Sequence, residues 1–99
     1  MRHLFVTVVL LGAAATAFAQ ERPVPLKDGT GKAVTESICS GCHSLDYIRI
    51  NAPFMTRQTW TASVNKMVQM FGAPIAPNDA TTIIDYLSTN YGPPAGSEK

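Results

Sequence analysis

The stretch Cys39-Ser40-Gly41-Cys42-His43 decides the fold of this 99-residue chain. Two cysteines three positions apart, with a histidine directly after them, form the C-x-x-C-H pattern, which is the attachment sequence of a c-type haem. On one helical turn both sulfurs can form thioethers to haem vinyl groups, and the next residue then presents its imidazole to the iron. The sequence therefore predicts a covalent haem c at Cys39 and Cys42, with His43 as an axial ligand.

Two other interpretations of these cysteines lack the residues they need. A thioredoxin-like redox pair belongs to a βαβ pattern, and no convincing strand run lies near the motif. A structural zinc site takes four ligands. Cys39, Cys42 and His43 provide three, and the other histidine, His3, lies in a segment that we expect to be removed.

Residues 1–19 have the three parts of a secretory signal peptide: a cationic start at Arg2, an apolar run over residues 4–18, and Ala17-Phe18-Ala19 as an A-x-A cleavage site. We expect cleavage before Gln20 and a periplasmic location, with no membrane insertion afterwards. The alternative is an uncleaved anchor, but the apolar run is shorter than the roughly 20 residues that a membrane span needs.

Removal of 19 residues from 99 leaves a single domain of 80, a size at which a covalent staple is usual. Loss of Arg2 leaves seven basic and seven acidic residues. The basic side chains of Arg49, Arg57 and Lys66 are scattered along the chain, whereas a phosphate-binding surface needs a clustered basic face. We therefore expect no nucleic-acid partner.

The segment 20–31 contains two prolines, two glycines and no helical period, so we interpret it as an extended N-terminal arm. It is either a terminus without structure or an arm that lies along a partner subunit. Residues 32–92 form the helical domain, and residues 93–99 form a flexible tail.

Helical periodicity and capping residues predict three main helices, over residues 32–40, 57–71 and 79–90. The first begins at Thr30 or Gly31. The second has Thr56 or Thr59 as N-cap and Gly72 just past its end. The third has Asn78 as its N-cap, and its expected buried face comprises Ala80, Ile83, Ile84, Leu87 and Tyr91.

The second iron ligand is expected to be a methionine, because Met opposite His is usual in electron-transfer haems. The candidates are Met55, Met67 and Met70. Met67 lies near the centre of a predicted buried stripe on the second helix, made of Trp60, Val64, Met67, Val68 and Phe71, and Met70 lies to one side. The alternative is that Met67 only fills the core, as methionine often does.

Three helices and loops around one haem resemble the class I cytochromes c in element order and in motif placement. This resemblance implies an all-α, small class I cytochrome c-like fold. Within it, we expect Trp60 and Tyr47 to lie in the haem pocket and offer hydrogen bonds to propionates, unless they are plain core aromatics. Residues 72–75, with Pro74 stiffening the turn, would close over the haem edge. The second ring N–H of His43 would donate to a backbone carbonyl, and the turn expected around residues 51–53 is well placed in the sequence to provide it.

A sharper resemblance spans residues 39–91. It rests on Cys42-His43-Ser44, Asp46-Tyr47-Ile48, Trp60, Val64, Lys66-Met67, Gly72-Ala73-Pro74-Ile75, Asp79-Ala80, Ile84, Asp85-Tyr86-Leu87 and Tyr91. These residues resemble the small haem c subunit of bacterial sulfite dehydrogenases. The resemblance implies that Met67 is the matching iron ligand, and that the chain binds a molybdopterin-containing catalytic subunit that oxidises sulfite. The molybdenum cofactor would lie in that partner only, and a soluble cytochrome c would accept the electrons.

Two classes of function remain at this point. In the first, the chain is a one-electron relay with no substrate chemistry of its own. It would act as a sulfite dehydrogenase subunit, as a relay for another dehydrogenase, or as a free shuttle. In the second, its haem binds a small ligand, in a sensor or a peroxidase-like enzyme, which needs an open sixth position. Met67 and the single mature histidine favour the relay.

Overall fold

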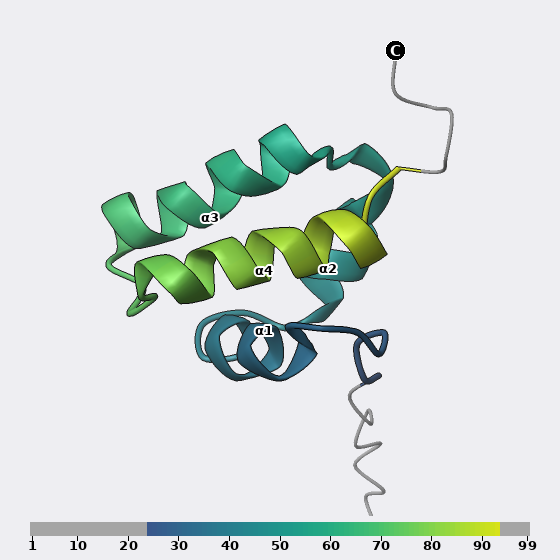
Figure 1. Cartoon of the computed structure of the whole chain (residues 1–99), viewed down its shortest axis with the longest axis horizontal. Helices are drawn as coiled ribbons and strands as arrows, with labels where there is room; N and C mark the ends of the chain where they lie inside the picture. The colour runs from purple at the N-terminus through teal and green to yellow at the C-terminus, as the bar shows by residue number, and fades with distance from the viewer. Residues whose placement is uncertain (1–23, 94–99) are drawn as a thin grey trace, which may run out of the picture.

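The computed structural model describes residues 24–93, which contain helices and no strand. The elements are α1 (Lys32–Cys39), α2 (Asp46–Asn51), the 3-10 helix η1 (Ala52–Phe54), α3 (Arg57–Phe71) and α4 (Pro77–Asn90) (Figure 1). The predicted all-α class is confirmed. The expected signal peptide, residues 1–19, and residues 94–99 of the expected tail lie outside the described residues.

Helix α4 is the centre of the fold, because it packs against both α3 and α1 (Figure 1). Its Ile83 is completely buried, and Tyr86 and Leu87 are nearly so. The predicted burial of Ile83, Ile84, Leu87 and Tyr91 is confirmed. Tyr86, which the sequence pattern did not single out, is one of the largest fully buried side chains.

A glycine allows α1 to approach α4. Gly31 is the N-cap of α1 and has a φ of 94°, in the left-handed region that glycine adopts without strain. A Cβ at this position would lie 3.0 Å from Cβ of Tyr86 and 3.1 Å from the carbonyl oxygen of Thr82. Both the backbone conformation and the close contact with α4 therefore favour glycine at the start of α1.

The bounds of α3 are those predicted from its capping residues. The Thr56 hydroxyl accepts a hydrogen bond from the Thr59 backbone N–H at 3.2 Å, which satisfies one of the free donors of the first turn. Gly72 follows the last helical residue with a φ of 67°. No other atom of residues 24–93 lies within 4 Å of a Cβ built at Gly72, so its φ, rather than a close contact within the chain, favours glycine here.

The helices differ from the predictions in three respects, of which the smallest is that α1 ends at Cys39, one residue before the predicted end. Helix α4 begins at Pro77 rather than at Asp79, because proline is well suited to the first helical position. The predicted N-cap, Asn78, therefore lies inside the first turn. Helices α2 and η1 were not predicted, and they include residues 51–53, which we expected to form a turn.

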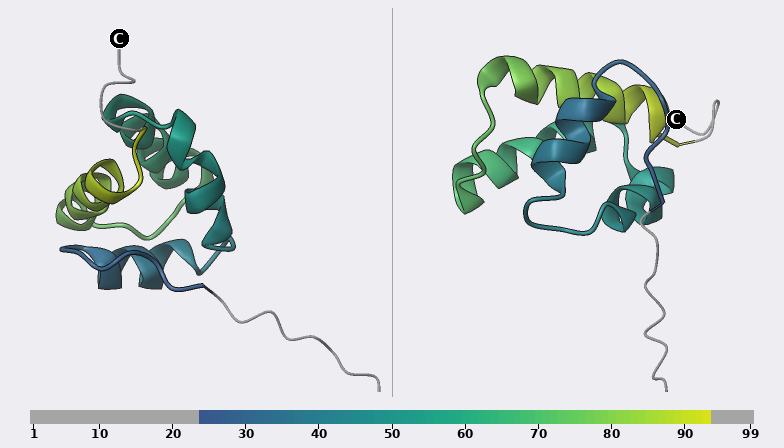
Figure 2. Two further views of the ribbon diagram at one scale, coloured as in Figure 1. Left: turned by 90° about the vertical axis from the view of Figure 1, so that its right-hand side faces the viewer. Right: turned by 90° about the horizontal axis from the view of Figure 1, so that it is seen from below.

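The structure also moves the boundary of the predicted arm. From residue 24 onward the arm packs against the folded body: Leu26 is buried, and its N–H donates to Glu36 of α1. The Lys27 N–H donates to the Tyr91 hydroxyl at 2.8 Å, and the Tyr86 hydroxyl donates to the Lys27 carbonyl at 2.5 Å. Residues 24–31 thus form a strap across α1 and the end of α4 (Figure 2) rather than an arm outside the domain.

Candidate functional site

The cysteine motif lies at the carboxyl end of α1. The helix ends at Cys39, and the chain continues to turn, with the Gly41 N–H donating to the Ile38 carbonyl at 3.2 Å. The His43 N–H donates to the Cys39 carbonyl at 3.3 Å, which is one helical turn. The backbone therefore brings Cys39, Cys42 and His43 together on a single turn.

The three side chains of this turn differ in exposure. Cys39 is half-buried and packs against the core, and this burial raises the pKa of its thiol. Cys42 and His43 are exposed. Both cysteines are free thiols, so no disulfide occupies them. One sulfur is thus fixed by the fold, while the other and the imidazole face outward.

The imidazole of His43 lies against the ring of Tyr47 in α2, with the ring centroids 6.0 Å apart and the planes inclined by 26°. The expected hydrogen bond from this imidazole to residues 51–53 is not found, and within residues 24–93 the ring makes no hydrogen bond. Asn51 instead donates from its side chain to the Tyr47 carbonyl at 2.8 Å. That bond fixes the end of α2 rather than the histidine.

The three candidate methionines lie in different surroundings. Met55 packs against the core, and Met70 is 72% exposed. Met67 is half-buried and is not among the described side chains that pack against the core. Its carbonyl accepts a hydrogen bond from the Ala73 N–H at 3.0 Å, which ties the end of α3 to the following loop.

The predicted buried stripe on α3 is confirmed only in its first half. Trp60 and Val64 are buried, whereas Phe71 is 68% exposed. The core cluster includes Trp60 and Val64 together with residues of α4, and it does not reach the last turn of α3. The prediction that Phe71 is buried is therefore wrong for the described chain.

The residues expected to line the haem pocket differ in their burial. Trp60 is 2% exposed, and its indole N–H donates to the Tyr91 carbonyl at 2.7 Å, so its donor is already used inside the core. This is the plain core role that the sequence left open. Tyr47 is half exposed and Pro74 is exposed, while Ile75 beside it packs against the core.

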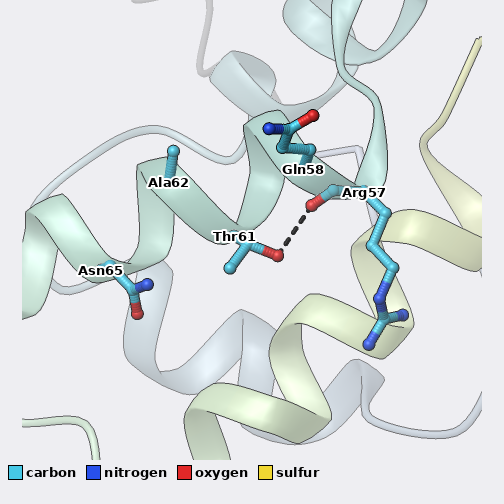
Figure 3. A pocket seen from close by; sticks show the side chains of 5 residues that line it. All are labelled: Arg57, Gln58, Thr61, Ala62 and Asn65. Carbon is cyan, nitrogen blue, oxygen red and sulfur yellow. Dashed lines mark hydrogen bonds between the residues drawn. The ribbon is translucent and has the colours of Figure 1, made fainter.

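A separate hollow lies along α3 (Figure 3) and is lined by Arg57, Gln58, Thr61, Ala62 and Asn65. It is open to solvent, and two of its lining residues make ordinary surface interactions. The Thr61 hydroxyl donates to the Arg57 carbonyl at 2.8 Å, and the Arg57 guanidinium donates to Asp85 at 2.5 Å. None of the predicted site residues lines this hollow.

Among residues 24–93, no three side chains of His, Cys, Asp or Glu converge in a way that could hold one metal ion. In the same part of the chain, no helix has the length and apolar character that crossing a bilayer requires.

No protein-family model matches this chain, and no curated protein matches its sequence. The functional interpretation therefore rests on the motif, on the resemblance described above, and on the geometry of the turn at residues 39–43.

Sequence reasoning missed one feature of this region. Tyr47, Ile50 and Phe54 are 50%, 70% and 79% exposed, and they lie on α2 and η1 directly after the motif. Tyr47 and Ile50 are three positions apart on α2, so recognising a helix over residues 46–51 would have placed these two side chains near one another on its surface.

Proposed function

We propose that this chain is a periplasmic mono-haem c-type cytochrome that acts as a one-electron relay. The observation that carries the proposal is the turn at residues 39–43. It carries two free thiols and an imidazole on one backbone turn, and within the described chain no disulfide occupies the thiols and no hydrogen bond occupies the imidazole.

The donor set fits a covalently attached haem c. Each thiol of Cys39 and Cys42 can add across a vinyl double bond, so that sulfur bonds to one carbon, hydrogen goes to the other, and no oxidant is needed. His43 offers a nitrogen ligand, and Met67 offers a thioether that is not committed to the core. Bound at these residues, haem supplies a one-electron iron couple.

The remaining residues of the turn and its surroundings determine how firmly the site is held. Cys39 anchors one attachment point to the core, because it is half-buried at the end of α1. The Tyr47 ring lies nearly parallel to the His43 ring, with the centroids 6.0 Å apart. Met67 sits on a helix whose two ends are capped at Thr56 and Gly72, so its backbone position is well fixed. A methionine opposite a histidine raises the reduction potential of the iron.

The identity of the electron donor and of the electron acceptor rests on the resemblance alone. The residues shared with the haem subunit of sulfite dehydrogenases support a molybdopterin-containing catalytic subunit as the electron donor and a soluble cytochrome c as the acceptor. This chain would then carry electrons singly between them, with no catalytic residue of its own.

The test is covalent attachment. The full chain is expressed with an export pathway and a haem-attachment system, and a denaturing gel is stained for haem. We expect a stained band, because thioether bonds survive conditions that break axial ligation. A redox titration of the same protein should then fit a single one-electron step. An exported protein without covalent haem would overturn the proposal.

A further inference from the structure

Helix α2 is attached to the core along a single line of apolar side chains. Leu45, Ile48 and Ala52 lie three and four positions apart, and Leu45 and Ala52 flank α2 with helical backbone angles, so all three fall on one side of the helix. Ile48 is buried, and the other two pack against the core cluster. Contacts along one line fix the position of a short helix, but they leave it free to roll about that line.

The residue after Ile48 provides a second attachment, to one side of this line. Successive residues of an α-helix are about 100° apart around its axis, so Arg49 lies on one side of Ile48 and Tyr47 on the other. The Arg49 guanidinium donates to the Val24 carbonyl at 2.7 Å and forms an ion pair with Asp46. The first of these contacts joins α2 to the strap, residues 24–31.

The strap is itself firmly attached to the rest of the body. Leu26 is buried, and the Lys27 backbone is bonded through its N–H and its carbonyl to the hydroxyls of Tyr91 and Tyr86. Val24 lies only two positions before Leu26, so its carbonyl is an acceptor held in place. A bond to that carbonyl therefore prevents α2 from rolling relative to α4.

On the opposite side of Ile48, α2 reaches the haem-attachment turn, residues 39–43. The Tyr47 ring lies against the His43 ring, with the centroids 6.0 Å apart and the planes inclined by 26°. Because neighbouring side chains turn together with a helix, a roll that carried Arg49 away from the strap would also move Tyr47 relative to His43. The strap is thus connected with the proposed iron ligand through a single turn of α2.

We propose that Arg49 is a positioning residue for the haem-attachment turn: its bond to the strap fixes the rotation of α2 and, with it, the place of the Tyr47 ring beside His43. This inference rests on the proposed function, because it assigns His43 to the iron. Within residues 24–93 the Arg49 guanidinium bonds to Val24 and Asp46, so its effect on the turn is indirect.

The experiment removes the contact between α2 and the strap from each side in turn. Arg49→Gln removes the guanidinium. Deletion of residues 21–25 removes the Val24 carbonyl and leaves Arg49 and Asp46 in place, so it tests the same contact even if Arg49→Gln does not accumulate. A third protein combines the two changes. The matched control is Arg57→Gln, because Arg57 also forms a surface ion pair, with Asp85, and does not bond to the strap.

The readout is the proton NMR spectrum of each full chain, loaded with haem and in the ferric state. The orientation of an axial imidazole influences how the unpaired spin of ferric haem is distributed over the haem methyl groups, so their shifts report on that orientation. The ring protons of His43 are a second reporter, since the only other histidine, His3, lies in the expected signal peptide.

We expect Arg49→Gln and the deletion to shift the haem-methyl and His43 ring resonances from their parent positions in the same direction. The combined protein should show the shifts of either single change and no more, because both changes remove one contact. Arg57→Gln should give the parent spectrum. If Arg49→Gln lowered the urea midpoint and left these resonances unmoved, then Arg49 would only stabilise the fold, and the inference would be wrong.

Three other results would also contradict the inference. Resonances that move in Arg49→Gln and stay in place in the deletion would show that Arg49 acts through Asp46 rather than through the strap. Shifts that add in the combined protein would show two independent effects. A parent without covalent haem would defeat the proposed function, and the positioning role with it, whereas a haem-loaded parent with unshifted variants would leave the relay intact.

Discussion

Two regions of this small protein use similar side chains in opposite ways. Around α4, Ile83 is fully buried and Trp60 is 2% exposed. Around α2 and η1, Ile50 is 70% exposed and Phe54 is 79% exposed. The difference shows that position in the fold, rather than side-chain type, decides what is buried. The first region supplies stability, whereas Ile50 and Phe54 add little to the core of the described chain.

The largest expected effect is on the haem-attachment turn, which precedes α2 in the sequence. Cys39→Ala combined with Cys42→Ala should abolish covalent haem staining completely, because no other cysteine is present. Ser40→Ala, a change within the same turn that leaves both thiols, should stain like the parent. A haem stain that persists in the double variant would show that the turn is not the attachment site.

The next effect separates the three methionines. Met67→Ala should remove the weak absorbance of a sulfur–ferric iron bond and lower the reduction potential, because the thioether ligand is lost. Met55→Leu and Met70→Leu should preserve both properties, since one side chain packs against the core and the other is 72% exposed. Visible spectra and redox titration measure this. Loss of the absorbance in Met70→Leu, with retention in Met67→Ala, would show that Met70 is the ligand and that the predicted orientation of α3 is wrong.

A matched pair of isoleucines tests the comparison of regions directly. Ile83→Ala should lower the free energy of unfolding by about 2–5 kcal/mol, because it leaves a cavity in the core. Ile50→Ala should change it by less than about 0.5 kcal/mol, because the side chain is exposed. Urea denaturation of both variants is the measurement. Equal losses would mean that Ile50 contributes to folding as much as the buried Ile83 does.

The smallest effect concerns the strap. Burial, and after it the neighbouring Tyr91 side chain, raise the pKa of Tyr86, whose hydroxyl donates to the Lys27 carbonyl. The Tyr86 hydroxyl therefore loses its proton at a lower pH in the unfolded chain than in the folded chain. Its contribution to the free energy of unfolding is complete below a pH of about 10 and is lost as the pH rises above that value. Tyr86→Phe should cost about 1 kcal/mol at neutral pH and flatten this decline. Urea midpoints on both sides of pH 10 test this, with Tyr47→Phe as the control. If the urea midpoint of Tyr86→Phe fell just as steeply above pH 10, the loss of stability would come from another titrating group.

The sequence was most informative where local chemistry determines the structure. The Thr56 hydroxyl and Gly72 mark the ends of α3 correctly, because a cap and a left-handed residue act within one turn. The start of α4 was missed by two residues, because Pro77 takes the first helical position and Asn78 is then no longer the cap. Helix α2 has six residues, too few to show a clear period.

Long-range contacts explain what the sequence did not reveal. Residues 24–28 have no helical pattern, and they are held by Tyr86 and Tyr91 some sixty positions further along. The donor of Trp60 is used by a backbone carbonyl at Tyr91, which no side-chain pattern indicates. The motif at residues 39–43, by contrast, lies within one turn, and so its three residues are brought together by local structure alone.

The most direct test of the account is the intact mass of the exported protein, measured by mass spectrometry under denaturing conditions. We predict the mass of residues 20–99 plus one haem, with both thiols protected from alkylation because each is a thioether. A mass equal to the polypeptide alone, with Cys39 and Cys42 both open to alkylation, would contradict the central claim that this turn binds a covalent haem.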